Sequence, residues 1–420
     1  MTSEKLSRSD LELMAPAGSR EALAAACAAG ADSVYFGVGK LNMRSGASSA
    51  FTVENLPEVA AICREHGVKS YLTLNTVIYD DDIEEMKATV TAAKAAGIDA
   101  VIASDVAVMR FCNEVGVEVH LSTQLNIANV EALRFYAQFA DVAVLARELN
   151  LKQVSRISEA IREENIVGPT GKPLRLEMFC HGALCMAVSG KCYMSLHTRG
   201  KSANRGACLQ TCRRSYVIKD TERDIELELD NGYIMSPKDL KTIEFVDDMV
   251  ASGVKVFKVE GRARGPEYVR AVIESYDQAL AAACEGGATQ AQKEAWNQRL
   301  SEVFNRGFWS GYYLGKTTAE LTDGYGSKAT LVKRHLGKCV GYFAKVGVAQ
   351  FQIQSQGFEK GARLLVIGPT TGAVEVTAED FLVDGKAASS VQKGQSFTMK
   401  MPEKVRENDT LYIMETRQAD

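Results

Sequence analysis

The chain contains no long apolar run. No stretch of its 420 residues approaches the roughly 18 consecutive apolar residues that a membrane-spanning helix needs. It begins with a charged segment, MTSEKLSRSDLELMAPAGS, which leads into a strand-like run without the apolar core and cleavage site of a secretory signal. We therefore expect no membrane association and a reducing, cytoplasmic location. In that compartment, metal binding or burial explains the 10 cysteines better than disulfides do.

The chain also lacks an excess of basic residues. Its 49 Lys and Arg against 53 Asp and Glu give a net charge of −4, which excludes a uniformly basic nucleic-acid coat but allows a local basic patch. Residues 178–219 contain no Asp or Glu. The basic residues of this segment are Lys191, Arg199, Lys201, Arg205, Arg213, Arg214 and Lys219. The pattern fits either a solvated loop or a surface that contacts phosphate groups.

The common local signatures of proteases are missing. Neither G-x-S-x-G nor H-E-x-x-H occurs, so the sequence supports neither a nucleophile elbow nor a zincin-type metalloprotease. The nearest Cys/His pair is Cys180 and His181. Adjacent residues of a strand point to opposite faces, so these two side chains are not expected to meet. Proteolysis is therefore the less favoured activity.

The first two thirds of the chain alternate short β-rich runs with Ala-rich helical patterns, which is typical of parallel βα units. Strands are predicted at residues 11–16, 33–38, 69–75, 100–104, 118–124, 141–146, 174–181 and 256–261. Helices are predicted at residues 20–29, 53–66, 81–96 and 267–284. The predicted fold class is α/β, a TIM-like (β/α)₈ barrel with its active site at the carboxyl ends of the strands. An open doubly wound sheet is the main alternative.

Two further regions complete the predicted organisation. A long Cys-rich insertion at about residues 182–255 lies within a barrel domain at residues 1–325, and such long insertions are commonly functional. Residues 330–420 read as a small antiparallel β-barrel. Its strands are predicted at residues 338–345, 349–355, 362–367, 372–376, 395–401 and 410–414. This domain is either a second RNA-binding surface or a stabilising or dimerising module, and its candidate basic contacts are Lys345, Lys360, Arg363, Lys393 and Lys400.

Four cysteines form the most informative pattern, Cys185-x₆-Cys192-x₁₅-Cys208-x₃-Cys212. Four thiolates favour tetrahedral zinc or an iron–sulfur cluster, and burial as small apolar residues is the non-functional alternative. Paired C-x-x-C knuckles, the usual structural zinc arrangement, do not occur. The remaining cysteines divide into expected core residues and one candidate additional thiol: the core set is Cys27, Cys63, Cys112, Cys284 and Cys339, and the thiol is Cys180.

Several motifs resemble one known family. The segment EMFCHGALCMAVSGKCYMS, from Glu177 to Ser195, resembles the signature of the collagenase-like peptidase U family. The segment NRGACLQTCR, from Asn204 to Arg213, resembles its second cysteine motif. The opening ELMAPAG and the later KVEGR and FNRGF segments are further matches. The resemblance covers essentially the whole chain and, in length and layout, is greatest to the branch called tRNA hydroxylation protein P.

The resemblance implies a function and a cofactor. Members of this branch make 5-hydroxyuridine at the wobble position of certain tRNAs and depend on iron–sulfur assembly and prephenate. It therefore implies a 4Fe-4S cluster on Cys185, Cys192, Cys208 and Cys212, with tRNA as partner and prephenate as co-substrate. The alternatives are a collagenase-like peptidase and a non-catalytic iron–sulfur RNA-binding protein. Whether the chain forms a homo-oligomer is left open.

The candidate site residues follow from the predicted strand ends. Arg44, Arg147 and Arg262 are candidates for binding the carboxylates of prephenate, because guanidinium groups match carboxylates in geometry. Asn75 and Gln124 are candidates for hydrogen bonds to a base edge or substrate.

Three further residues are candidates for proton transfer. Glu260 is a candidate general acid or base, with Lys258 on the same strand face to hold its charge. His181 is a candidate proton relay. The non-functional alternatives are an ion pair inside the barrel and a satisfied core histidine. The candidate phosphate contacts are Arg199, Lys201, Arg205, Arg213 and Arg214.

Overall fold

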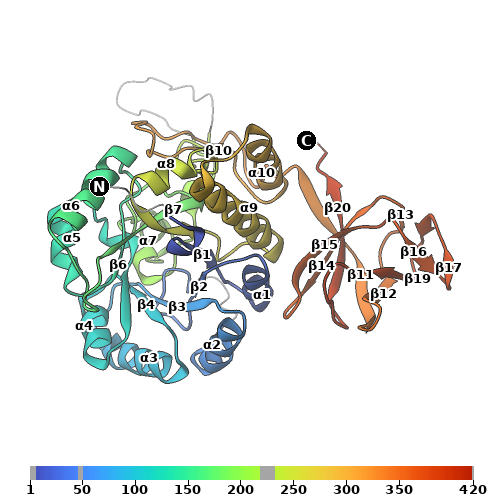
Figure 1. The fold of residues 1–420 in the computed structure, drawn as a ribbon, viewed down its shortest axis with the longest axis horizontal. Helices are drawn as coiled ribbons and strands as arrows, with labels where there is room; N and C mark the ends of the chain where they lie inside the picture. Colours follow the sequence, from blue (N-terminus) through green and yellow to red (C-terminus); the bar gives the residue numbers. More distant parts are fainter. Residues whose placement is uncertain (1–5, 46–50, 218–231, 419–420) are drawn as a thin grey trace.

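The computed structural model describes residues 6–45, 51–217 and 232–418. Figure 1 shows a barrel with helices around it and, beside helices α1, α9 and α10, a group of antiparallel strands at the C-terminal side. Within the described residues, no helix is both long and apolar enough to cross a membrane.

Eight parallel strands close into a barrel, and this confirms the predicted fold. They are β1 (Glu12–Pro16), β2 (Ser33–Phe36), β3 (Lys69–Leu74), β4 (Ala100–Ala103), β5 (Glu118–Leu121), β6 (Val142–Val144), β7 (Arg175–Gly182) and β9 (Val254–Val259). Each strand pairs with the next, and β9 pairs in parallel with both β7 and β1. The closed ring excludes the open doubly wound sheet.

Helices cover the outside of the barrel. They are α1 (Arg20–Ala28), α2 (Leu56–Glu65), α3 (Ile83–Ala96), α4 (Val106–Val115), α5 (Val130–Ala137), α6 (Leu151–Glu163), α8 (Val246–Ala251), α9 (Pro266–Glu285) and α10 (Gln290–Glu302). Their ends carry local signals: the Ser19 hydroxyl accepts from the Ala22 amide at the start of α1, and α3 ends at Gly97 with φ 76°. The four helices predicted from the sequence are confirmed, whereas α4, α5, α6, α8 and α10 were not predicted.

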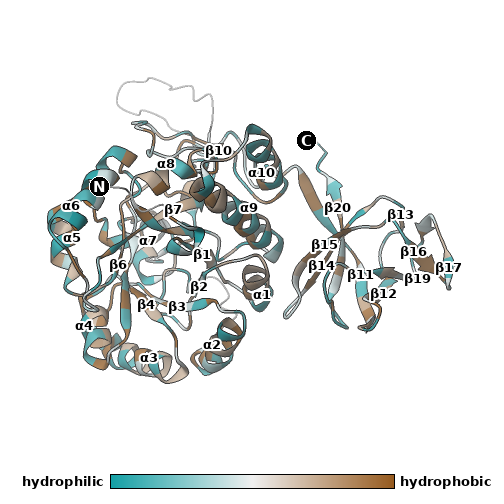
Figure 2. Cartoon of the chain, in the orientation of Figure 1, coloured by the Kyte–Doolittle hydropathy of each residue, from teal (hydrophilic) through white to brown (hydrophobic). Residues whose placement is uncertain are grey.

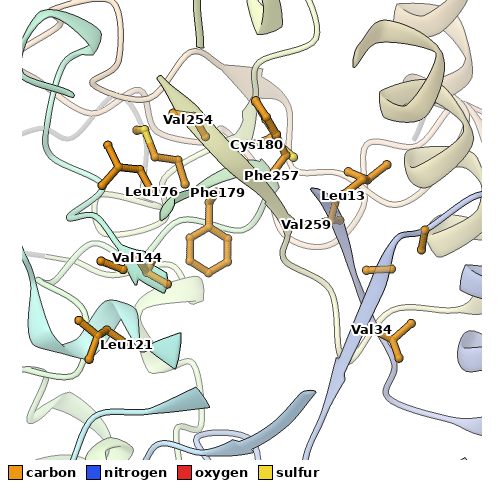
Figure 3. Packing of buried hydrophobic residues seen from close by; sticks show 14 of the residues in the cluster. Leu13, Val34, Leu121, Val144, Leu176, Phe179, Cys180, Val254, Phe257 and Val259 are labelled. Atoms are coloured by element: carbon orange, nitrogen blue, oxygen red, sulfur yellow. The ribbon is translucent and has the colours of Figure 1, made fainter. Parts of the chain in front are cut away.

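The main core lies between strands and helices. Figure 3 shows part of it, including Leu13, Val34, Leu176 and Phe257, while the Phe179 ring projects into the space between the strands. In Figure 2 the hydrophobic colour appears on the barrel strands, and the surrounding helices carry both the hydrophobic and the hydrophilic colour. This arrangement is what strands buried on both faces require.

The barrel interior is apolar in the middle and charged at its amino-terminal end. Met14, Tyr35, Tyr71, Ile102, Val142 and Val256 belong to the interior cluster. At the amino-terminal end, the Glu12 carboxylate accepts from Ser33, Tyr71 and Arg175 at 2.7 to 2.9 Å. This filled interior leaves the carboxyl-terminal mouth as the open end.

The insertion between β7 and β9 contains regular elements as well as loops. It holds α7 (Met194–Arg199) and the strand β8 (Asp239–Lys241), which pairs antiparallel with the end of β7. The short strand β10 (Phe308–Trp309) adds to β8 in parallel. Neither β8 nor β10 was predicted, because strands of two or three residues carry too little periodicity to be recognised.

The C-terminal part is antiparallel, as predicted. One eight-stranded sheet has the order β15-β14-β20-β11-β12-β19-β16-β17, and β13 pairs with β18. The bounds are β11 (Leu331–Phe343), β12 (Val348–Ile353), β13 (Phe358–Glu359), β14 (Arg363–Gly368), β15 (Gly372–Thr377), β16 (Phe381–Val383), β17 (Lys386–Ala387), β18 (Ser390–Val391), β19 (Ser396–Lys400) and β20 (Thr410–Thr416). β11 begins well before the predicted strand. The domain division near residues 325–330 stays a prediction.

This C-terminal sheet is packed directly against the barrel. Ala25 of α1 shares a buried cluster with Leu365 and Ala373. Gly372, at φ 73°, lies so close to α1 that a Cβ there would be 2.7 Å from the Ala25 nitrogen. The Arg270 guanidinium of α9 also pairs with Glu403. The two parts therefore share a close apolar and ionic contact.

Candidate active site at the barrel mouth

A cavity of about 380 Å³ opens at the carboxyl ends of the barrel strands. One wall comes from strand ends and the loops that follow them, and the other comes from the insertion. The cavity brings together all four cysteines of the pattern and seven other predicted residues, namely Arg44, Asn75, Gln124, Arg147, Lys258, Glu260 and Arg262. Its size is that of a small-molecule site.

The four cysteines lie on the insertion side of the cavity. Cys185 and Cys208 are exposed, and Cys192 and Cys212 are half-buried. Burial raises the pKa of the Cys212 thiol; Arg213 opposes this, and the charges of the other three cysteines add to it. The thiols are thus near neighbours, and their soft sulfur donors suit iron–sulfur clusters and zinc. As they stand in the described chain, no three His, Cys, Asp or Glu side chains are grouped closely enough to hold one metal ion.

The other cysteines lie away from the cavity. Cys63, Cys112 and Cys339 are buried in apolar clusters, while Cys27 and Cys284 are partly buried against the main core, as predicted. Cys180 is fully buried, and its thiol contacts the Lys258 carbonyl at 3.4 Å. Burial raises the pKa of the Cys180 thiol, and Cys180 is not part of the cavity lining. The structure therefore does not group Cys180 with the four thiols.

Polar contacts fasten the insertion to the barrel rim. Arg205 pairs with Asp82 at 2.5 Å, and its guanidinium lies over the Tyr79 ring at 4.3 Å. The Asn126 amide donates to the Ser189 carbonyl at 3.0 Å. These contacts hold both halves of the insertion over the mouth.

Arg213 provides a second fastening. Its guanidinium donates to the Leu184 carbonyl, to the Pro237 carbonyl at 2.5 Å and to the Ser236 hydroxyl at 3.2 Å. Burial lowers the pKa of Arg213. Because Leu184 precedes Cys185 and Arg213 follows Cys212, this side chain links the first and last cysteines of the pattern.

These contacts divide the predicted phosphate-binding residues into two groups. Arg205 and Arg213 are engaged with protein groups, which makes them less available to RNA phosphates than the exposed residues; RNA binding by this set stays a prediction. These contacts are tertiary, because the partners come from other parts of the chain. Exposed side chains remain at Lys191, Arg199, Lys201 and Arg214, and Lys219 lies outside the described residues.

Arg44 and Glu260 form an ion pair in the cavity wall, with Nη2 and Oε1 2.7 Å apart. Burial alone would raise the pKa of the Glu260 carboxyl, but the charges of Arg44, Arg264 and Arg147 bring it down to about 2. Glu260 is therefore ionised near neutral pH. Its observed contact is with an arginine, which favours positioning Arg44 over exchanging protons.

Lys258 has a different partner from the predicted one. Its ammonium group lies 2.7 Å from Glu177 Oε1, and both residues are buried. Glu177 Oε2 has no hydrogen-bond partner among the described residues. The expectation that Lys258 holds the charge of Glu260 is therefore wrong: β7 supplies the partner of Lys258, and the loop after β2 supplies that of Glu260.

Arg147 and Arg262 face the cavity with neutral partners. Arg262 donates to Thr73 Oγ1 at 2.8 Å and to Asn42 Oδ1 at 3.3 Å. Burial lowers the pKa of Arg262 to about 10. Arg147 donates to the Ala183 carbonyl at 3.1 Å and lies over the Phe179 ring at 4.0 Å, while its buried Nε has no hydrogen-bond partner in the part of the chain that the structure describes. Two guanidinium groups bound to neutral atoms are suited to a negatively charged ligand.

Asn75 and Gln124 lie in one hydrogen-bonded group. Asn75 Nδ2 donates to Ser122 Oγ at 3.1 Å and lies 3.5 Å from Gln124 Oε1, which also accepts from the Ser122 hydroxyl. Gly190 of the insertion, at φ 75°, packs against Gln124, because a Cβ there would be 2.7 Å from Gln124 Cγ. The insertion and the barrel thus shape this corner together.

His181 is the one predicted catalytic residue that the structure does not bring to the cavity. It is buried, with its ring 5.6 Å from those of Tyr276 and Phe308. Burial and the charges of Lys241 and Arg264 lower the pKa of His181 to about 3. The register shift of β7 between Phe179 and His181 gives the physical reason, since a bulge changes which face a side chain occupies.

Sequence reasoning missed some residues of the cavity lining, and the RNA contacts expected in the C-terminal part stay a prediction. Thr73 and Ser122 stand beside predicted strand ends, so their position was a usable signal, whereas Tyr193 carried none. In the C-terminal sheets, Lys360 lies 3.6 Å from Asp380, and Arg363 pairs with Glu302 and Glu375. Lys345, Lys393 and Lys400 are exposed.

Comparison with known proteins assigns the chain to a protein family. The family model described as Peptidase family U32 matches residues 18–323. A protein named collagenase from Porphyromonas gingivalis W83 is 55% identical over 97% of this chain and 99% of its own length. The tRNA hydroxylation protein P1 of Bacillus subtilis is 31% identical over 85% of this chain and 83% of its own. The 23S rRNA 5-hydroxycytidine C2501 synthase of Escherichia coli is 35% identical over 66% of this chain and 40% of its own. The chain belongs to peptidase family U32.

Proposed function

We propose that the protein is a tRNA-modifying hydroxylase that forms 5-hydroxyuridine at the wobble position. The observation that carries this proposal is the content of one cavity: four thiols on one wall, and on the other two arginines bound to neutral partners. Relatives named for tRNA hydroxylation and for rRNA 5-hydroxycytidine synthesis support a nucleic-acid substrate.

The proposed reaction replaces the C5–H bond of a uracil base with a C5–OH bond, which is a two-electron oxidation of the base. The co-substrate is a hydroxylated dicarboxylate, prephenate by family resemblance. It supplies the hydroxyl and takes the two electrons and the hydrogen, so that R–OH leaves as R–H. No other oxidant is then needed for the atoms and electrons to balance.

The anionic co-substrate has candidate partners in Arg147 and Arg262. Each can offer a guanidinium group to a carboxylate without breaking an existing ion pair, since their present acceptors are neutral oxygens or ring faces. Arg44 is already neutralised by Glu260. We therefore assign Arg44 to shaping the wall rather than to primary anion binding.

An iron–sulfur cluster fits the donor chemistry of Cys185, Cys192, Cys208 and Cys212, and when bound it would supply redox chemistry beside the co-substrate. The chain's own residues have separate tasks. In this proposal Arg147 and Arg262 orient the anion, and Asn75 and Gln124, which line the same cavity, contact the base. The exposed basic side chains of the insertion contact the phosphates of an unpaired tRNA loop in this proposal.

Peptidase activity is the second candidate, because a relative that is 55% identical is named collagenase. A serine or cysteine peptidase needs a base within hydrogen-bond reach of its nucleophile. The lining of the described cavity contains cysteine and serine but no histidine. A purely structural cluster is less favoured as well, since the thiols face a cavity and not a packed interior.

The test is mass spectrometry of tRNA nucleosides from a deletion strain that has no second copy of this family. Loss of 5-hydroxyuridine and of the nucleosides built on it supports the proposal. Persistence of the modification, together with impaired gelatin turnover, would favour the peptidase.

A further inference from the structure

An exposed tyrosine stands at the edge of the cavity. Tyr193 belongs to the cavity lining and is 69% exposed, whereas Tyr35 and Phe179, the other aromatic residues of the lining, are 5% and 6% exposed. Tyr193 lies between Cys192 and the first residue of α7. Its backbone is therefore fixed by the helix start, while its ring is open to solvent.

Two apolar side chains of the lining are exposed beside it. Met186 is 48% and Val188 is 46% exposed, and we call these two residues and Tyr193 the lip. Exposed apolar groups gathered at the entrance of a cavity commonly mark a contact surface. The lip is such a surface, since nothing in the described chain covers it.

The charge around the lip identifies the kind of partner. Lys191 lines the cavity and is exposed, and Arg199 and Lys201 are exposed at the end of α7. The described part of this segment, residues 178–217, carries no acidic residue. An aromatic ring among exposed cations, which have no ion-pair partner in the described part of the chain, matches single-stranded nucleic acid. The bases of such a strand stack on rings, and its phosphates attract lysine and arginine.

We infer that the lip binds an unpaired RNA base by stacking on the Tyr193 ring, with Lys191 and its basic neighbours contacting the adjacent phosphates. RNA therefore reaches the cavity as an unpaired loop and not as a duplex. The inference rests on the proposed function, which makes RNA the substrate. It adds the contact that selects an unpaired base at the entrance.

The test measures RNA binding, not modification. The full-length protein, purified without oxygen, is titrated into a fluorescently labelled hairpin with an anticodon-like loop and into a fully paired duplex. Tyr193→Ala is expected to bind the hairpin about tenfold more weakly, and Tyr193→Phe to bind it within about twofold of wild type, because only the ring is needed. Leu196→Ala, a change at an exposed residue of α7 outside the cavity lining, is the matched control and keeps wild-type affinity.

Salt dependence separates stacking from charge. Tyr193→Ala keeps the wild-type slope of log affinity against log salt, because the tyrosine ring neutralises no phosphate. Lys191→Ala makes that slope shallower by about 0.7 for each phosphate of a single strand that the lysine neutralises in the wild type. Equal affinities of wild type and Tyr193→Ala for the hairpin would overturn the inference, as would equally weakened binding in Tyr193→Ala and Tyr193→Phe.

The results of these experiments distinguish a failure of base stacking at the lip from a failure of the proposed hydroxylase function. If wild type binds the loop and forms 5-hydroxyuridine, and Tyr193→Ala does both equally well, stacking at the lip is wrong and the hydroxylase stands. If wild type binds neither RNA, the proposed function fails together with the inference. Binding to vesicles of anionic lipid that is abolished in Tyr193→Ala, with RNA binding unchanged, would also overturn it.

Discussion

Arg44 Nη2 lies 2.7 Å from Glu260 Oε1, and this ion pair joins the loop after β2 to the residue that follows β9. It neutralises one of the three arginines that line the mouth. Arg147 and Arg262 keep neutral partners, and they are the two arginines that we propose for anion binding. The ion pair thus distinguishes Arg44, which is neutralised by a carboxylate, from the two arginines proposed to bind the anion.

We predict that the Arg44–Glu260 ion pair contributes to the free energy of unfolding in a pH-dependent way. The pKa of Glu260 is about 2 in the folded protein against 4.5 when unperturbed, so its contribution is fully present above 4.5 and is lost as the pH falls toward 2. A shift of this size corresponds to about 3 kcal/mol. Urea unfolding of wild type and Glu260→Gln should show the full difference in unfolding free energy at pH 7 and less than half of it near pH 3. Glu148→Gln, a change at an exposed carboxylate, is the control; an equal difference at both pH values would contradict the assignment.

Replacement of Arg147 or Arg262 should weaken ligand binding even when the new residue is lysine. Lysine offers a point charge in place of a planar fork, so Arg147→Lys and Arg262→Lys are each expected to weaken prephenate binding about tenfold or more. Calorimetric titration of the anaerobic protein measures this. Arg156→Lys, at an exposed position on α6, should bind as wild type does. Unchanged affinity in both cavity variants would remove these arginines from the anion site.

Substitutions of the two neighbouring residues Arg213 and Arg214 should differ in their effect on the reactivity of the cysteines. Arg213→Ala removes hydrogen bonds to the Leu184 and Pro237 carbonyls and should loosen the backbone next to the cysteines. Cys185 and Cys212 should then react several-fold faster with a thiol reagent. Arg214→Ala, at the exposed neighbour, should leave the rates unchanged. Peptide mass spectrometry after timed alkylation measures the reaction rates of the cysteines in both variants. Matching rates in the two variants would show that Arg213 does not position the cysteines.

Metal content tests the thiol set. Protein prepared without oxygen is expected to hold close to one four-iron cluster, and Cys208→Ala should lose most of the iron because a thiolate ligand is missing. Cys284→Ala, outside the cavity, should retain it. Zinc in place of iron would overturn the cluster, and unchanged iron in Cys208→Ala would exclude that ligand.

The barrel and its mouth were largely predictable from the sequence. Parallel strands end at one edge of the barrel, so arginines and amides just beyond successive strands were bound to meet, as Arg147, Arg262 and Asn75 do. Partners across the fold were not predictable. The acid-free segment at residues 178–219 gives no sign of Asp82, a rim residue distant in sequence, which neutralises Arg205. The bulge in β7 that removes His181 from the cavity depends on pairing with β9, which no local pattern encodes.

The central claim is that this cavity carries out the hydroxylation of tRNA. The most direct measurement is the amount of 5-hydroxyuridine in tRNA from the deletion strain after complementation, with protein levels matched by immunoblot. The wild-type gene and Arg156→Lys should restore it, whereas Cys208→Ala and Arg262→Gln should not. Full restoration by both cavity variants, or no loss of the nucleoside in the deletion strain, would contradict the claim.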